Sequence, residues 1–172
     1  MLGLMQQRSL LISSLIDFAE KHHGDSEVVS RRVEGDIHRS DWAQVARRSR
    51  QVANALDAQK VPQGARIATL AWNGYRHLEL YFGVSGSGRV LHTINPRLHP
   101  EQMAWIANHA EDQILCFDMT FLPLVQALHA HCKTVTHFVA LCDADKLPAD
   151  TGIPNLLSYE AWMGRQPDTY TW

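Results

Sequence analysis

The sequence predicts an α/β fold in which a parallel sheet is flanked by helices and preceded by a small N-terminal β-hairpin. From residue 67 onward, short apolar segments alternate with helical segments. The connections between them are short, which favours right-handed crossovers between parallel strands. The strand segments are apolar throughout, as expected when helices cover both faces of a sheet.

The composition is that of a globular domain. The chain has 172 residues, of which 45% are apolar and 20% charged, enough for one ordinary core. A net charge of -2 gives no general affinity for nucleic acid, and no nucleic-acid partner is predicted.

The apolar run from Leu10 to Ile16 is too short to span a bilayer, so no transmembrane segment is predicted. Cys116, Cys132 and Cys142 are irregularly spaced, as in reduced, partly buried thiols of a cytoplasmic protein.

Residues 1–40 are predicted to form an N-terminal helix and the hairpin. Ser9 is the predicted N-cap of a helix that runs to His23, with apolar residues at helical spacing. The hairpin arms, residues 27–32 and 37–39, flank a turn that contains glycine.

The second predicted helix opens the sheet subdomain, residues 41–142. Asp41 is its predicted N-cap. Its apolar stripe recurs at steps of three and four and consists of Trp42, Val45, Ala46, Ser49, Val52, Ala53 and Leu56. Arg47, Arg48 and Arg50 lie away from that stripe, which predicts a solvated helix face rather than a nucleic-acid patch.

The rest of the subdomain repeats strand and helix. Strands are predicted at 67–71, 90–94, 113–117 and 135–141, and helices at 75–85, 100–110 and 121–131. The last part, residues 143–172, is predicted to be a polar loop, a short helix capped by Ser158 and a stretch without a structural ending.

The loops that follow the first two parallel strands hold the candidate substrate-binding residues. Ligands of open parallel sheets gather at the carboxyl ends of the strands. Trp72 and Asn73 follow the first strand, His77 comes one helical turn later, and Asn95 and Arg97 follow the second strand. Consecutive strands are often neighbours, so these loops are expected to lie side by side. Four of these residues also have a structural interpretation: a helix cap or turn for Asn73 and a turn for Asn95. His77 could satisfy a neighbouring carbonyl or carboxylate, and Arg97 could be a surface or domain-interface cation.

Other segments do not support a site. The glycines in residues 85–88 follow a helix and precede a strand, so they are predicted to stop the helix rather than cradle phosphate. His129, His131 and Cys132 are close in the chain, but positions two apart on a helix do not share a face. No second cluster completes the four ligands of a zinc site, so no metal site is predicted. Neither a GxSxG nucleophile motif nor a GxxxxGK[ST] nucleotide loop occurs, and no catalytic residue is predicted in this chain.

Several motifs occur in an order shared with one enzyme family. A Gly-containing turn leads into His-Thr-Ile-Asn-Pro-Arg-Leu at 92–98, and the next helix ends in Asn-His-Ala-Glu-Asp at 108–112. Upstream lie Glu-Val-Val-Ser at 27–30 and His-Arg-Ser-Asp-Trp at 38–42. The chain resembles, over nearly its whole length, the N-terminal part of medium- and long-chain fatty-acyl-CoA ligases, the AMP-forming acyl-CoA synthetases of the adenylate-forming superfamily.

The resemblance implies part of the N-terminal domain of the acyl-CoA synthetase fold. Such enzymes form an acyl-adenylate from a fatty acid and ATP with Mg²⁺, and CoA then displaces AMP. The phosphate loop, the nucleotide-binding set and the catalytic lysine of the family lie downstream of the matched region. The resemblance therefore implies an N-terminal fragment with no cofactor of its own, inactive alone, whose partners are the remainder of the ligase and a second copy in a homodimer.

Two other hypotheses stay open. The chain could be a stand-alone flavodoxin-like module that binds a nucleotide or CoA at the two loops, or the non-catalytic partner of a split ligase. The sequence leaves the acyl chain length undetermined.

Overall fold

The computed structural model describes residues 3–4 and 7–172, and it shows two separate sheets. The helices are α1 (Ile12–His23), α2 (Trp42–Ala58), α3 (Tyr75–Gly86), α4 (Pro100–Ala110), α5 (Leu122–Leu128) and α6 (Tyr159–Met163). The strands are β1 (Glu27–Arg31), β2 (Ile37–Asp41), β3 (Arg66–Leu70), β4 (Val90–Thr93), β5 (Asp112–Phe117), β6 (His137–Ala140) and β7 (Leu156–Ser158).

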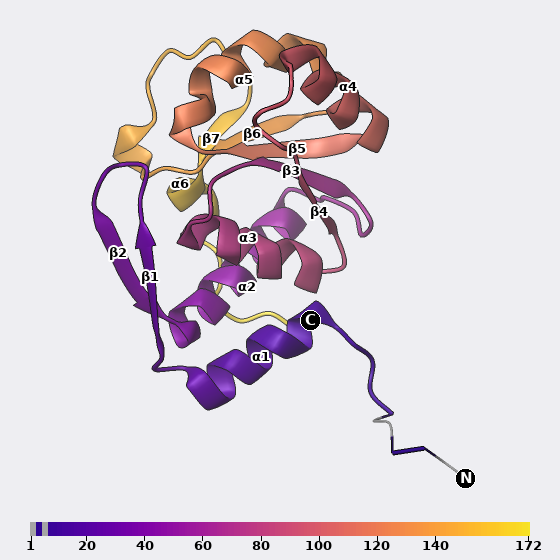
Figure 1. Ribbon diagram of the computed structural model, residues 1–172, viewed down its shortest axis with the longest axis vertical. Helices are drawn as coiled ribbons and strands as arrows, with labels where there is room; N and C mark the ends of the chain where they lie inside the picture. The colour runs from indigo at the N-terminus through magenta and orange to yellow at the C-terminus, as the bar shows by residue number, and fades with distance from the viewer. Residues whose placement is uncertain (1–2, 5–6) are drawn as a thin grey trace.

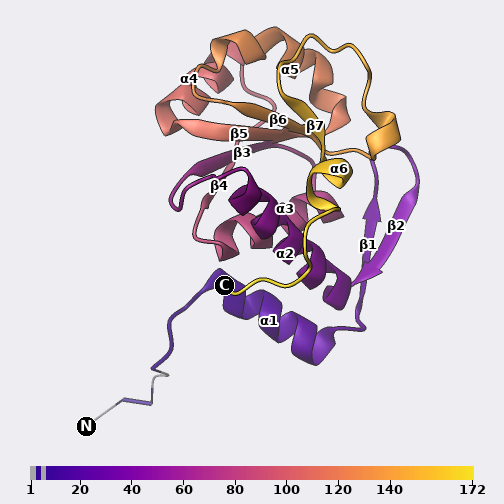
Figure 2. The same cartoon turned by 180° about the vertical axis from the view of Figure 1, so that it is seen from behind.

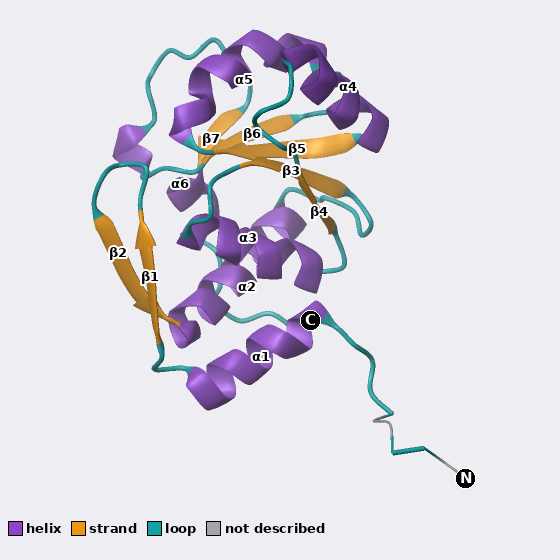
Figure 3. Cartoon of the chain, viewed as in Figure 1, coloured by secondary structure: helices purple, strands orange, loops and turns teal. Residues whose placement is uncertain are grey.

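The larger sheet is parallel and has the strand order β4-β3-β5-β6-β7, whereas β1 and β2 form an antiparallel hairpin. Helices α4 and α5 cover one face of the larger sheet, and α2, α3 and α6 lie on the other (Figure 1). Helix α1 packs beyond α2, and the hairpin stands beside the layers (Figure 3). The predicted α/β fold with a small hairpin is confirmed.

The alternation of side chains along the strands creates two cores. In β5, Ile114 and Cys116 point into a cluster with α2, α3 and α6, whereas Leu115 and Phe117 point into a cluster with α4 and α5. All four residues are at most 1% exposed. Because successive strand residues face opposite sides, an apolar run without alternation is the pattern that fills both cores.

The predicted N-cap residues are confirmed for two helices and wrong for one. Helix α1 begins at Ile12 with Leu11 as its N-cap residue, and no side chain caps it, so the predicted Ser9 cap is wrong. At α2 the prediction is confirmed, because the Asp41 side chain accepts a hydrogen bond of 2.7 Å from the backbone N–H of Gln44. Ser158 likewise caps α6 by accepting from the N–H of Ala161.

The expected solvated arginine face of α2 is confirmed for Arg47, which is exposed, and wrong for the other two arginines. Arg48 and Arg50 have only 18% and 15% of their side-chain surface exposed. Arg50 pairs with Glu20 of α1, and Arg48 pairs with Glu79 of α3. Both arginines hold α2 to neighbouring helices, since remote segments of the chain bring carboxylates to them.

The C-terminal part adds two features that the sequence pattern did not predict. Strand β7 extends the sheet next to β6. The last residues then return along the molecule to α1 (Figure 2), where the Trp172 indole N–H donates to Asp17. The Trp172 ring lies against Gly86, where an added Cβ would come within 2.8 Å of it. The glycines at 85–88 therefore allow close packing and end a helix, as predicted.

No helix in the described part of the chain is both long enough and apolar enough to cross a membrane.

Candidate functional site

The predicted site loops lie at one edge of the parallel sheet. Strands β3 and β4 are direct neighbours in register, with Thr69 opposite Thr93. Their carboxyl ends therefore adjoin, which confirms the expected adjacency of the two loops. Helix α3 starts in the first loop with Gly74 as its N-cap residue and without a side-chain cap, so Asn73 does not cap it.

A cleft of about 420 Å³ opens at this edge, between the hairpin and the start of α3. It is lined by Val28, Val29, Ser30, Asn73, Gly74, His77, Leu78, Tyr81 and Thr93. None of these side chains carries a formal charge when the histidine is neutral. Strand β1 supplies one wall, which sequence reasoning missed because the hairpin's position against the sheet depends on contacts far along the chain.

His77 is held by two hydrogen bonds. Its Nδ1 lies 3.2 Å from the carbonyl oxygen of Trp72, and its Nε2 lies 3.1 Å from Oγ1 of Thr69. Burial lowers the pKa of His77 below its ordinary value, with the Trp72 carbonyl acting in the opposite direction. The imidazole is therefore neutral at physiological pH.

Trp72 and Asp118 connect the ends of β3 and β5. The backbone N–H of Trp72 donates to Oδ2 of Asp118 over 2.6 Å. Burial raises the pKa of Asp118 to about 6, and this hydrogen bond counteracts the rise. The Trp72 ring is 47% exposed and lies 5.1 Å, centroid to centroid, from the ring of Phe121. Trp72 lines a small recess next to the main cleft.

The other two candidates lie in the loop after β4. Asn95 and Arg97 are both exposed, and Oδ1 of Asn95 accepts from the backbone N–H of Arg97 over 3.0 Å. That contact matches the turn interpretation of Asn95. Neither residue lines the cleft beside His77, so the structure brings together three of the five candidates and leaves two apart.

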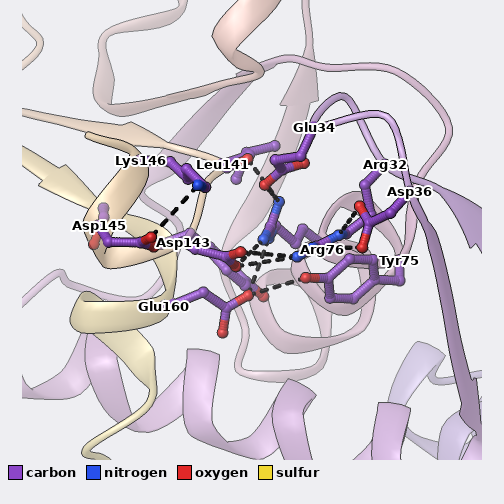
Figure 4. A network of polar contacts seen from close by, with 12 residues as sticks. Arg32, Glu34, Asp36, Tyr75, Arg76, Leu141, Asp143, Asp145, Lys146 and Glu160 are labelled. Carbon is purple, nitrogen blue, oxygen red and sulfur yellow. Dashed lines mark hydrogen bonds and ion pairs between the residues drawn. The ribbon is translucent and has the colours of Figure 1, made fainter. Parts of the chain in front are cut away.

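A network of partly or fully buried charges, absent from the sequence prediction, reaches the recess beside the cleft through Arg76; Figure 4 shows its members. At its centre is Arg76 of α3, which is 5% exposed. Its guanidinium contacts Glu34 at 2.7 Å, Asp143 at 2.6 Å and Glu160 at 3.0 Å. It also donates to the carbonyl of Leu141 over 2.9 Å. One side chain thus joins the hairpin turn, α3, the end of β6 and α6.

A second arginine extends this network into α2. Arg48 contacts Glu79 at 2.7 Å and Glu160 at 3.0 Å. The hydroxyl of Tyr159 donates to the other Glu79 oxygen over 2.8 Å. Burial raises the pKa of Glu79, and Arg48 opposes that rise. The network fixes the hairpin wall and α3 relative to each other and thereby sets the shape of the cleft.

A signal for this network does exist in the sequence. Arg76 and Glu79 are three residues apart on α3, and the fully buried Leu80, four residues after Arg76, lies on the same side of the helix. Charged residues are almost never fully buried unless they are paired. Charges within an apolar helix face therefore predict remote partners, although not which ones.

The described residues offer little for a metal or a nucleophile. They contain no group of three or more His, Cys, Asp or Glu side chains that could hold a metal ion. Cys116, Cys132 and Cys142 are free and buried, and burial raises the pKa of each thiol. Burial and a raised pKa are the properties of structural thiols rather than of reactive ones.

Comparison with known proteins identifies the family. The family model described as "AMP-binding enzyme" matches residues 16–167. The chain belongs to the AMP-binding enzyme family. It is 47% identical to a 3-methylmercaptopropionyl-CoA ligase of Ruegeria pomeroyi, over all of this chain and 32% of the relative. It is 42% identical to a medium-chain-fatty-acid–CoA ligase of Ectopseudomonas oleovorans, over all of this chain and 31% of the relative.

Solved structures give the same fold. An anthranilate CoA ligase in complex with anthranoyl-AMP superposes with a TM-score of 0.80 at 20% identity, over 98% of this chain and 30% of that one. A Mycobacterium tuberculosis fatty acyl CoA synthetase superposes with a TM-score of 0.73 at 19% identity, over 94% and 29%. The chain spans about a third of the length of the curated relatives it matches, and it corresponds to an N-terminal portion of acyl-CoA ligases.

Proposed function

We propose that this chain is the N-terminal portion of an ATP-dependent fatty acid–CoA ligase, which forms an acyl-adenylate and then an acyl-CoA thioester. The observation that carries the proposal is identity of 42–47% over the whole chain to CoA ligases. The family fold supports it. The partners are a carboxylic acid, ATP and CoA, and the proposed location is the cytoplasm.

The isolated chain is proposed to be inactive and to act by shaping one wall of the complete ligase. Attack of a carboxylate on ATP develops charge that cations and Mg²⁺ must stabilise. The described residues contain no group of three or more His, Cys, Asp or Glu side chains that could hold a metal ion. The guanidinium groups of Arg48 and Arg76 are already paired with carboxylates. We assign ATP and Mg²⁺ binding to the remainder of the ligase, with a homo-oligomer as the working assembly.

Trp72, Asn73 and His77 are proposed to contact substrate, because Asn73 and His77 line the larger cleft and Trp72 lines the recess beside it. That Asn95 and Arg97 contact substrate remains a prediction. Their loop adjoins the cleft edge through the pairing of β3 with β4.

The test is thioester formation with and without the missing part. The purified 172-residue chain is incubated with ATP, Mg²⁺, CoA and, in turn, 3-methylmercaptopropionate, a medium-chain and a long-chain fatty acid. No product is expected. Adding the downstream segment of the 42% identical relative is expected to produce pyrophosphate and thioester above the level of that segment alone. Thioester made by the chain alone would contradict the proposed inactivity.

Calorimetry with ATP, AMP, CoA and a fatty acid separates the alternatives. Micromolar binding of a nucleotide or CoA by the chain alone, without complementation, would instead favour the stand-alone binding module. Activity restored only by a separately encoded partner would favour the split ligase.

A further inference from the structure

Both ring nitrogens of His77 are engaged, and this fixes where its proton lies. A carbonyl oxygen can only accept a hydrogen bond, so the contact between Nδ1 and the Trp72 oxygen requires a proton on Nδ1. In the neutral ring Nε2 is then an acceptor, and the Thr69 hydroxyl donates to it over 3.1 Å. The geometry thus selects the Nδ1–H tautomer.

Thr69 is well suited to hold that ring. It is 1% exposed and lies on β3 between two paired strands, opposite Thr93 of β4 and Cys116 of β5. Its carbonyl also accepts from the N–H of Ile94 over 2.9 Å. A β-branched side chain on a backbone fixed on both sides has little rotational freedom, so its hydroxyl is a rigid donor.

The consequence concerns the chemistry of the cleft. With both nitrogens engaged, His77 has no free ring N–H or lone pair for a ligand in the cleft, where Val28, Leu78 and Tyr81 supply much of the remaining wall. We propose that Thr69 is a positioning residue that holds His77 in its neutral Nδ1–H tautomer in the wall of the cleft. This cleft then receives an uncharged aliphatic group of the ligand rather than a phosphate. This rests on the proposed substrate-binding role of His77 and excludes it as a proton donor or acceptor to substrate.

Nitrogen-15 NMR of the histidine rings of the full chain tests the positioning role, with His77→Gln to assign the signals. In the unaltered chain we expect the nitrogen-15 chemical shift of a protonated nitrogen at Nδ1 and that of an unprotonated nitrogen at Nε2. In Thr69→Val, which keeps the shape and removes the hydroxyl, the ratio of Nδ1–H to Nε2–H forms is expected to fall about fivefold, the equivalent of one hydrogen bond. Thr69→Ser should restore it.

Thr93→Val is the matched control, because Thr93 lies opposite Thr69 in register and also lines the cleft. It should leave the His77 signals unchanged. A protonated Nε2 in the unaltered chain, an unchanged spectrum in Thr69→Val, or an equal change in Thr93→Val would each overturn the positioning role.

The ligand class is tested with two probes on the same chain. n-Octanol is expected to shift the His77 ring signals in a saturable way, less so in Leu78→Asn, whereas inorganic phosphate should leave them in place. Saturable phosphate shifts, or no response to octanol, would overturn the assignment of an uncharged ligand group. Neither result depends on thioester formation, so failure of this inference and failure of the proposed ligase function are separate outcomes.

Discussion

The two faces of the parallel sheet are both buried, yet they are built from different chemistry. On the α4 and α5 side the core consists mainly of apolar side chains such as Leu115, Phe117 and Phe138. On the α2, α3 and α6 side an apolar core adjoins the charges of Arg48, Arg76, Glu79 and Glu160. The difference teaches that one sheet can be stabilised by non-directional burial on one face and by specific pairing on the other.

The difference follows from what each face must hold in place. Apolar packing tolerates small adjustments as long as volume is preserved. A buried arginine with several carboxylates fixes its neighbours in orientation, because an unpaired buried charge is strongly unfavourable. The charged face is the one that positions the hairpin wall of the cleft, through the contact of Arg76 with Glu34.

The largest expected effect is that of removing the central charge. Arg76→Met takes from the half-buried Glu34 the arginine that it pairs with, and it takes from Asp143 and Glu160 one of two arginine partners each. It should lower the free energy of unfolding by about 4 kcal/mol. Urea denaturation at pH 7 measures it. The control is Arg39→Met, which breaks the exposed Arg39–Glu27 pair and should change stability by less than about 1 kcal/mol. Equal effects would mean that the network contributes no more than a surface ion pair.

The apolar face should respond next most strongly. Leu115→Ala removes a side chain that is 1% exposed and should lower the free energy of unfolding by about 3 kcal/mol through lost burial and a cavity. The loss should be the same at pH 5 and pH 8, because no ionisable group is removed. Leu15→Ala on α1, where the leucine is 59% exposed, should change stability by about 0.5 kcal/mol or less. A strong pH dependence of the Leu115 effect would link the two faces and contradict their independence.

The smallest expected effect is a gain at Asp118. Burial raises the pKa of its carboxyl from 3.8 to about 6 in the folded chain. The raised pKa means that the folded state binds the proton more tightly, so Asp118 favours folding below pH 3.8 and this contribution is lost as pH rises to about 6. Asp118→Asn keeps an acceptor for the Trp72 N–H and should be more stable than the unaltered chain at pH 7, by about 2 to 3 kcal/mol, because each pKa unit corresponds to about 1.4 kcal/mol.

This prediction is tested by measuring the free energy of unfolding of Asp118→Asn and of the unaltered chain from pH 4 to pH 7 and taking the difference. It should grow across this window and level off above pH 6. Asp145→Asn, at a carboxylate 75% exposed, should give a flat difference curve. A flat curve for Asp118→Asn as well would show that its carboxyl is hydrated in solution.

The sequence by itself determined the elements and the adjacency of the site loops. Apolar segments of strand length gave the strands from β3 to β6, and Pro100 marked the first residue of α4, because these signals depend on neighbouring residues only. Asp41 could be assigned as a cap for the same reason. The carboxyl ends of β3 and β4 could be placed together because consecutive parallel strands usually pair.

Only the tertiary structure decided which charges are buried and what surrounds the cleft. Arg76 and Glu160 are 84 residues apart in the chain, and Arg48 and Glu160 are 112 apart. Whether an arginine is solvated or buried depends on whether a distant segment brings a carboxylate to it, since burial is tolerated only when the charge is paired. The residues around Arg48 in the sequence do not identify that distant partner. The sequence therefore predicts a solvated Arg48, whereas only 18% of its side chain is exposed.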